Sequence, residues 1–350
     1  MDDKDILISH INSKTYIGRS VLYRKEGDEC IIHGMNLLRV IMDENVMLKE
    51  YAAFFFNTRY FKRLVDSIKK DAVNQSSFSI TDFCKLEVPV PDIDYQKRVL
   101  QVLLPIDRKI ALNRKINAEL EQMAKELYDY WFVQFDFPNA EGKPYKSSGG
   151  KMVYNPQLKR DIPEGWEVKS VVDCTDVLYG YPFSTEMFVE EHIGNPVIRI
   201  RNIQDGTSSA FTTEEVDEKY RVEDGDVVLG MDGNFHCSIW HNNESFLNQR
   251  CVRFRVFENT PYTPFSIYFS LQPYIEQKQR TIIGSTVGHL LDSDIREMYL
   301  LTPNVEWRTI KSAFLSLSNK IIKNKRETTE LVVLRDQLLP LLMNGQVKKL

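Results

Sequence analysis

The side chains best spaced for acid–base chemistry are an aspartate and a histidine four residues apart, Asp232 and His236, in MDGNFHCSI. A carboxylate near an imidazole can move a proton, but loops of this polarity are more often plain surface. The six histidines are scattered, and the HExxH zinc motif and the GxxxxGK[ST] phosphate loop are both missing from the sequence. So is the NPPF or DPPY tetrapeptide with which an amino-methyltransferase holds a flipped adenine. We therefore expect a protein without catalytic activity, cofactor or metal.

Length and composition narrow the class of protein. The chain has 350 residues, which suggests two domains at about 150 residues each, and 43% apolar with 27% charged residues is ordinary globular composition. No apolar run approaches the roughly 18 residues that span a bilayer, and MDDKDILISH is no signal peptide. The five cysteines are odd in number and never spaced CxxC, which argues against a zinc ribbon and against secretion. We expect a soluble cytoplasmic protein without membrane contact, and its net charge of −4 weighs against DNA binding by charge alone.

The strongest pattern is an internal repeat. Residues 95–131 and 306–342 superpose without a gap, and in both the residues of one stripe recur in alternating steps of four and three. A 3.5-residue period predicts two long helices with the narrow stripe of a coiled coil. Each helix would be roughly 50 Å long at about 1.5 Å per residue. Pro105 and Pro340 limit their regularity, and Pro340 can end the second helix early.

Two such stripes in one chain most simply pack against each other. In an antiparallel pair that is aligned about its centre, Asn117 faces Asn324 and Asn113 faces Thr328. Polar layers of this kind fix register and orientation at some cost in stability. The alternative is two surface helices on separate domains.

The repetition continues upstream of the helices. Three further pairs of segments are similar, and they are 5–18 with 226–239, 33–56 with 248–270, and 79–99 with 290–310. Each pair shares its order of strand-like runs, loops and helix starts. The chain therefore reads as two copies of one unit, each a globular domain followed by a long helix. Because the stretch matching 165–222 has no counterpart in the first copy, we expect the first domain to be truncated at its N-terminus or naturally shorter.

Several stretches, taken in order, resemble the specificity (S) subunit of type I restriction-modification systems. They are SHINSKTYIG, HGMNLLRV, ELEQMAKELYDYWFVQFDFP (119–138), DIPEGWEVKSVVDC (161–174), PVIRIRNIQDG (196–206) and FLNQRCVRF (246–254). The resemblance covers nearly the whole chain, and it is the order and spacing of these pieces that makes it specific.

The resemblance implies an α+β fold with an internal pseudo-two-fold repeat, in which two target-recognition domains with mixed β-sheets are linked by two long helices packed as an antiparallel coiled coil. The expected segments are a shortened first recognition domain (1–93), a central conserved helix (94–135), a linker (136–160), a second recognition domain (161–303) and a C-terminal conserved helix (304–350). The aromatic residues after the first helix are expected to pack its end against the next domain, and they are Trp131, Phe132, Phe135 and Phe137.

The resemblance also implies a function. Each recognition domain would read one half of a bipartite site in double-stranded DNA, while the helices set the spacing and dock methyltransferase (M) subunits. The internal two-fold symmetry predicts two M copies, and restriction (R) subunits join this core. Three alternatives stay open: a silent fragment that needs another chain to supply the missing part, one working domain acting in two copies on a symmetric site, and a coiled-coil scaffold that does not bind DNA.

We expect the DNA-reading residues in loops that carry hydrogen-bonding side chains. Arg suits guanine, and Asn or Gln suits adenine. Phosphate contacts by Lys, Ser or Thr set only the position of the protein on DNA. In the second domain the candidates are Arg199, Arg201, Asn202 and Gln204, then Asn234, Phe235 and His236, then Ser285, Thr286 and His289. In the first domain they are His10, Asn12, Ser13, Lys14 and Tyr16, then Asn74, Gln75, Ser76 and Ser77.

Each candidate also has a structural explanation. Arg199 and Arg201 alternate along a predicted strand and can be its solvated face. Asn234 and Phe235 fit ordinary turn chemistry. The loop at Ser285 can be an ordinary loop in which only the glycine has a role, a structural one. Asn248, Gln249 and Arg250 lie at the start of a likely strand and are second choices.

Overall fold

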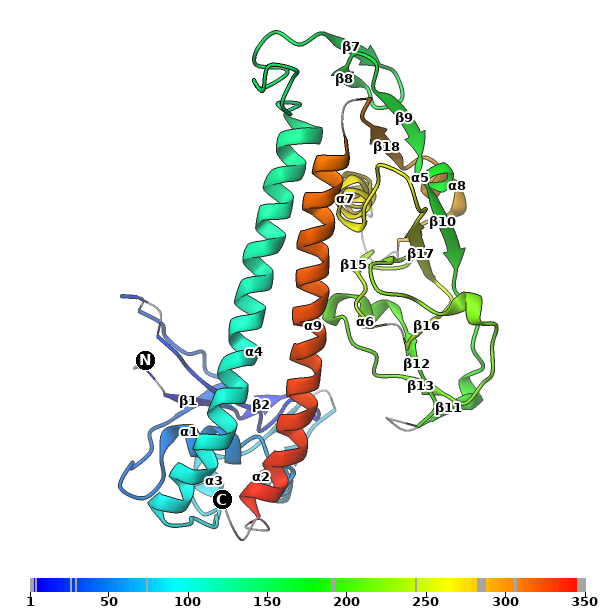
Figure 1. The fold of residues 1–350 in the computed structure, drawn as a ribbon. Coiled ribbons are helices and arrows are strands. Elements are labelled where there is room, and N and C mark those ends of the chain that lie inside the picture. Colours follow the sequence, from blue (N-terminus) through cyan, green and yellow to red (C-terminus); the bar gives the residue numbers. More distant parts are fainter. Residues whose placement is uncertain are drawn as a thin grey trace. The chain divides into compact units, whose positions relative to one another are not determined.

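The computed structural model describes the chain except residues 1, 2, 4, 26, 29, 74, 190–192, 243, 282–287, 305–306 and 345–350. It divides into two compact units. Unit 1 comprises Met1–Leu112 with Thr328–Leu350, and unit 2 comprises Asn113–Glu327. Among the described residues, no helix has the length and apolar character needed to cross a membrane. Figure 1 shows the course of the chain and labels the helices and strands described below.

Unit 1 is built on a three-stranded antiparallel sheet in the order β3-β1-β4. Its strands are β1 (Ile6–Ser9), β3 (Ser20–Leu22) and β4 (Leu37–Val40). Alternate residues of β1, Ile6 and Ile8, are fully buried against helices α1 (Lys49–Phe55) and α2 (Arg59–Ile68). A second small sheet joins β2 (Ile11–Asn12), β6 (Ser76–Ser77) and β5 (Lys70–Asp71), and the short helix α3 (Ile80–Phe83) follows.

Unit 2 has a larger antiparallel sheet in the order β10-β17-β14-β15. Its strands are β10 (Thr175–Tyr179), β17 (Cys251–Val256), β14 (Val227–Gly230) and β15 (Cys237–Ile239). All four residues of β14 are buried, and helix α7 (Pro264–Thr281) contributes Ile267, Leu271 and Ile275 to the same core.

Three smaller sheets complete unit 2. The first is four-stranded, in the order β11 (Phe188–Val189), β13 (Phe211–Thr212), β12 (Asn195–Ile198) and β16 (Phe246–Leu247). The other two are two-stranded: β9 (Glu167–Ser170) pairs with β18 (Tyr299–Thr302), and β7 (Met152–Asn155) pairs with β8 (Arg160–Pro163). The short helices are α5 (Val171–Cys174), α6 (Ile200–Asp205) and α8 (Asp292–Arg296), with 3-10 turns at Thr185–Met187 and Glu218–Tyr220. Among the strands described in this unit, β12 and β16 are the pair that runs parallel.

The repeat expected from the sequence is present in the topology. In unit 1 the central strand β1 pairs Leu7 with Arg39 of β4, and in unit 2 the central strand β14 pairs Val228 with Arg253 of β17. A buried aspartate precedes each central strand: Asp5 binds Arg39 at 2.7 Å, and Asp226 binds Arg255 of β17 at 2.7 Å. Strand β10 belongs to the stretch for which the sequence shows no counterpart in the first copy. The sheet of unit 1 correspondingly has three strands where that of unit 2 has four.

The two long helices are α4 (Ile93–Tyr128), which ends in a π-helical turn (Asp129–Val133), and α9 (Trp307–Met343). They pair antiparallel in each unit. In unit 1 the hydroxyl of Tyr95 donates to the carbonyl of Leu342 at 2.6 Å, and in unit 2 Asn324 donates to Asn117 at 2.9 Å, as the sequence predicts.

One detail of the helix pair differs from expectation. Helix α9 continues through Pro340 to Met343. The missing N–H removes one hydrogen bond, while Leu342 beyond it is 1% exposed and packs into the core of unit 1. In unit 2, Asn113 donates to the Glu327 carboxylate at 2.8 Å.

Candidate nucleic-acid interface

Three loops of unit 2 leave the strands at a common edge. Because β12 and β16 run parallel, the loops that begin at Arg199 and Asn248 emerge side by side, and the N–H of Asn248 bonds to the carbonyl of Ile198 at 3.2 Å. The loop after β14 joins them, since the N–H of Met231 bonds to the carbonyl of Arg250 at 2.8 Å. A Cβ on Gly230 would come within 3.0 Å of Ile200. Candidate residues far apart in the sequence are thus brought to one surface.

The pair Arg199 and Arg201 does not alternate along a strand, which corrects the sequence interpretation. Strand β12 ends at Ile198, and Arg199 is the N-cap of α6, whose first turn holds Arg201. The reason is the Asn202 side chain, which accepts from the Arg199 N–H at 3.1 Å and starts a helix. Gly206, with φ of +67°, ends that helix.

These two guanidinium groups carry positive charge without a carboxylate partner within the described chain. Arg201 is exposed, while Arg199 is half-buried, its guanidinium lies 5.5 Å from the Phe188 ring centre, and its Nε has no hydrogen-bond acceptor. Burial, and then repulsion from Arg201, lower the pKa of Arg199. Guanidinium groups at the start of a helix, without carboxylate partners among the described residues, suit a phosphate oxygen or the acceptor edge of guanine.

The other two candidates of this loop differ in role. Asn202 is 4% exposed, and its amide donates to Ser209 at 3.0 Å, so the side chain is engaged in capping and in the loop. Gln204 is exposed on α6. Of the four residues expected here, Arg199, Arg201 and Gln204 can therefore face a ligand.

The loop after β14 contains a core residue among the candidates. Phe235 is 1% exposed and belongs to the core of unit 2, so the expectation that it contacts DNA does not fit the structure. Its φ is +45°, a backbone conformation that few residues other than glycine adopt. Asn234 beside it is exposed, and its carbonyl accepts from Gln279. His236 is half-buried, and its carbonyl accepts from Gly230.

Asp232 is paired with a different histidine from the one that spacing suggests. Its Oδ1 lies 2.7 Å from Nδ1 of His289, and its Oδ2 lies 3.6 Å from Nε of Arg250. His289 and Arg250 are exposed, so one carboxylate holds two donors at the surface. Sequence reasoning placed Arg250 second and missed Asp232 as the shared partner. The φ of Arg250 is +64°, a left-handed conformation that an arginine in the sequence does not predict. Ser285 and Thr286 lie outside the described residues.

In unit 1 the two candidate loops meet through β2 and β6, which pair Asn12 with Ser76. Lys14 forms an ion pair with Asp71 at 3.5 Å, and the Ser76 hydroxyl donates to the same carboxylate at 2.5 Å. Ser76 is 1% exposed and serves the hairpin. Asn74 lies outside the described residues.

The remaining first-unit candidates form the loop surface. His10 Nε2 lies 2.8 Å from the carbonyl of Met35, and Asn12 donates to Ser9 at 2.9 Å while accepting from the Ser13 N–H at 2.8 Å. Tyr16 is 49% exposed under the guanidinium of Arg19, which lies 4.3 Å from the ring centre. The candidates with exposed side chains here are Lys14, Tyr16 and Gln75, with Ser13 and Ser77 half-buried.

The candidate loops occupy the same place in both units. In unit 1 the N–H of Phe78 bonds to the carbonyl of His10, and in unit 2 the N–H of Leu290 bonds to the carbonyl of Met231. In each case the loop after the central strand meets the segment that precedes a short helix. Within the described ranges no group of three His, Cys, Asp or Glu side chains could hold a metal ion. The arrangement therefore offers hydrogen-bonding and cationic groups for binding.

Comparisons with known proteins agree with this geometry. The chain is 26% identical over 322 residues to the type I restriction enzyme MjaIX specificity subunit of Methanocaldococcus jannaschii, covering 89% of this chain and 72% of the relative. It is 23% identical over 407 residues to the HindI specificity subunit of Haemophilus influenzae, covering 98% and 86%. The fold matches the crystal structure of a type I S subunit from M. genitalium with a TM-score of 0.51 at 14% identity, over 97% of this chain and 83% of that one.

The family assignment rests on both halves of the repeat. The sequence model of the type I restriction modification DNA specificity domain matches residues 1–122 and 163–331. Each matched stretch contains one central sheet, its loops and most of one long helix. The chain accordingly belongs to the type I restriction-modification DNA specificity family.

Proposed function

We propose that this chain selects the DNA target of a type I restriction-modification complex and carries out none of its chemistry. The observation that carries the proposal is the repeated unit, in which the same central strand, neighbouring strand and loop contacts recur in units 1 and 2. Two similar readers in one chain suit a target with two halves. We assign the recognition domains to residues 1–93 and 161–303, joined through the linker 136–160.

In the second domain we assign reading to the converging loops. Arg199 and Arg201 supply cations without carboxylate partners among the described residues, and Gln204, Asn234 and His289 supply exposed polar groups. Side chains of this kind reach base edges in the major groove or phosphates beside it. In the first domain Lys14, Tyr16 and Gln75 hold the corresponding place.

The helix pair sets the spacing between the two readers in this proposal. The buried Asn117–Asn324 contact fixes register, because shifting either helix would leave an amide without its partner. The outward faces of both helices are the surfaces for M subunits, two by the internal symmetry, and R subunits join through that core. The complex acts on DNA in the cytoplasm and requires no cofactor from this chain.

The test is the pattern of DNA methylation in cells that express this chain with its cognate M subunit, obtained by single-molecule sequencing of modified adenines. Two unlike half-sites at fixed spacing would show that both units read DNA. An inverted repeat would show that only one unit reads, in two copies. If the protein is folded but directs no methylation, the proposal is overturned and the role of a coiled-coil scaffold that does not bind DNA is favoured.

A matched pair of variants makes the assignment specific. Arg201→Ala should relax the bases accepted in one half-site and leave the other half unchanged. Lys143→Ala removes an exposed cation from the linker, far from the loops in sequence, and should leave the methylated motif unchanged. If both variants change the motif equally, Arg201 contributes only general charge.

A further inference from the structure

Asp232, Arg250 and His289 lie on three segments of unit 2 that the backbone holds together. The N–H of Met231 bonds to the carbonyl of Arg250 at 2.8 Å, and the N–H of Leu290 bonds to the carbonyl of Met231 at 2.8 Å. Asp232 and His289 form an antiparallel bridge. These three residues, which we call the surface triad of unit 2, are thus fixed by hydrogen bonds between segments, as side chains that must hold a defined position require.

Unit 1 has the same backbone contacts with different side chains. There the N–H of His10 bonds to the carbonyl of Asn36 at 3.1 Å, and the N–H of Phe78 bonds to the carbonyl of His10 at 3.1 Å. Ile11 pairs with Ser77. The equivalent surface triad of unit 1 is therefore Ile11, Asn36 and Ser77. Because these contacts form there without any charged side chain at the three positions, the fold does not require the charged cluster of unit 2.

The carboxylate of Asp232 occupies only one side of each of its partners. Its Oδ1 lies 2.7 Å from Nδ1 of His289, and its Oδ2 lies 3.6 Å from Nε of Arg250. A neutral imidazole that donates from Nδ1 accepts hydrogen bonds at Nε2, and the two terminal nitrogens of the guanidinium keep their N–H groups. The side chains of His289 and Arg250 are 54% and 61% exposed. The triad therefore presents an acceptor and a pair of donors to a ligand.

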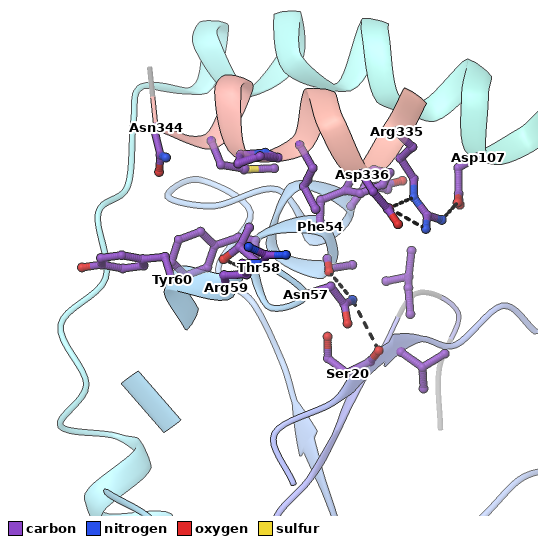
Figure 2. A pocket seen from close by; sticks show the side chains of 18 of the residues that line it. Ser20, Phe54, Asn57, Thr58, Arg59, Tyr60, Asp107, Arg335, Asp336 and Asn344 are labelled. Atoms are coloured by element: carbon purple, nitrogen blue, oxygen red, sulfur yellow. Dashed lines mark hydrogen bonds and ion pairs between the residues drawn. The ribbon is translucent and has the colours of Figure 1, made fainter. Parts of the chain in front are cut away.

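An arginine of unit 1 shows the opposite arrangement. Arg335 reaches two carboxylates, Asp107 at 3.5 Å and Asp336 at 2.8 Å, and Figure 2 shows both of these ion pairs. Its side chain is 27% exposed. Arg335 is thus neutralised inside unit 1, whereas Arg250 is open to a ligand.

The two carboxylates that follow His289 in the sequence have partners of their own. Asp292 binds Arg296 at 2.6 Å, and Asp294 binds Lys278 at 2.8 Å. Among the described residues of unit 2, Asp232 is the acidic residue that contacts His289 and Arg250. The donors and the acceptor of the surface triad are therefore not taken up by these neighbouring acids.

Taking the proposed selection of DNA as the basis, we propose that each surface triad selects one base pair of its half-site, a G·C pair for unit 2 and an A·T pair for unit 1. In the major groove guanine offers two acceptors, N7 and O6, and its cytosine offers the N4 donor. Arg250 matches the two acceptors, and Nε2 of His289 matches the donor. In unit 1, Asn36 is exposed, and its amide matches the N7 acceptor and the N6 donor of adenine.

The first experiment uses the full chain with its M subunit and reads both half-sites from the methylated motif. Arg250→Ala and His289→Ala should each relax one G·C position, and Asn36→Ala should relax one A·T position in the other half-site. Arg296→Ala, the matched control, removes an exposed guanidinium that is also paired with an aspartate, and should leave the motif unchanged. Arg250→Gly, which a φ of +64° accommodates, replaces Arg250→Ala if that variant does not fold.

Modified duplexes identify the atoms that are read. Replacing the guanine at the relaxed position by 7-deazaguanine removes the N7 acceptor and should weaken binding of the complex by about fivefold or more. Inosine keeps N7 and O6 but lacks the amino group in the minor groove, so it should change binding by less than about twofold. The effect of 7-deazaguanine should disappear in Arg250→Ala, because this variant lacks the donor.

Three results would overturn this assignment while the proposed function stands. They are a motif that neither Arg250→Ala nor Asn36→Ala changes, relaxation at a base pair of the other kind, and equal weakening on all DNA sequences, which would mark a phosphate contact. If the folded wild-type chain directs no methylation at all, the proposed function fails and the assignment of these base pairs fails with it.

Discussion

The side-chain amide of Asn324 donates to Oδ1 of Asn117 at 2.9 Å, and the amide of Asn117 in turn approaches the carbonyl of Ile321 at 3.4 Å. Asn117 is 7% exposed between α4 and α9 of unit 2. The Asn117 side chain thus accepts from Asn324 and donates to a backbone carbonyl within an apolar stripe, where an amide without these partners would be costly to bury.

Replacing one member of this pair should therefore cost more than replacing both. Asn117→Leu leaves Asn324 without its acceptor, and we expect the free energy of unfolding to fall by about 1–3 kcal/mol. The double variant Asn117→Leu with Asn324→Leu should recover most of that loss, but with looser register. Chemical denaturation of the three proteins checks this, and additive losses would contradict it.

Leu120→Asp should weaken the helix pair, because Leu120 packs on the cluster that contains Ile321 and Phe314. A charge in this apolar contact should lower the free energy of unfolding by about 2 kcal/mol or more. Leu112→Asp, on the same helix at a residue 51% exposed, is the control and should change it by less than about 0.5 kcal/mol. Equal melting temperatures for the two variants would argue against helix pairing at Leu120.

Arg199→Ala and Arg201→Ala should differ in their response to DNA sequence. If a guanidinium group reads guanine, its loss should cost about 1–3 kcal/mol on the cognate half-site and little on other sequences. If it contacts phosphate, binding should weaken on all sequences, with a shallower salt dependence. Binding of the complex with M subunits to cognate and scrambled duplexes at two salt concentrations separates the outcomes, and no effect from either variant would remove this loop from the interface.

Asp232→Asn should disturb the reading surface without disturbing the core. The carboxylate orients His289 at 2.7 Å and Arg250 at 3.6 Å, so its loss should reduce specificity for one half-site while thermal stability changes little. Arg250→Ala should produce the same change of methylated motif. If Asp232→Asn lowers stability and leaves the motif intact, the cluster is only structural.

His241 should make stability depend on pH in the acid range. Burial, followed by repulsion from Lys325 and Arg326, lowers the pKa of His241 from 6.5 to about 4. Between these values the unfolded chain binds the proton and the folded chain does not, so the free energy of unfolding falls as pH drops from about 7 to 4, by up to about 3 kcal/mol. Denaturation at pH 7 and pH 5 for the wild type and His241→Gln checks this, because the variant should have a smaller pH slope. Equal slopes would refute it.

The parts of the fold that follow from periodicity were predictable. The 3.5-residue stripe located both long helices and the Asn117–Asn324 layer, because side-chain spacing along a helix depends only on local geometry. The repeat located β1 and β4 of unit 1 and β14 and β17 of unit 2 as strand-like runs, because similar segments recur in the same order, but it did not predict which strands pair. The continuation of α9 through Pro340 was not predictable, because tertiary burial of Leu342 outweighs the lost backbone hydrogen bond.

The interface was predictable as loops but not residue by residue. Arg199 caps a helix because Asn202 bonds to its N–H, and Phe235 lies in the core at a turn where its φ is positive. Neither property follows from residue type in an isolated loop. The contact between Asp232 and His289 joins residues 57 positions apart, which a local motif cannot reveal.

The route of the chain through the helix pair has a consequence for how the protein is made. Tyr95 bonds to Leu342, 247 residues later, and Leu342 lies in the core of unit 1 beside Val99 and Leu103. At about 5–20 residues per second, a ribosome needs roughly 10–50 s to make the intervening chain. In the sequence, unit 2 lies wholly between the two segments that form unit 1. The first sheet to be synthesised is thus the last to receive its complete core, and the nascent chain must keep that apolar surface from aggregating in the meantime.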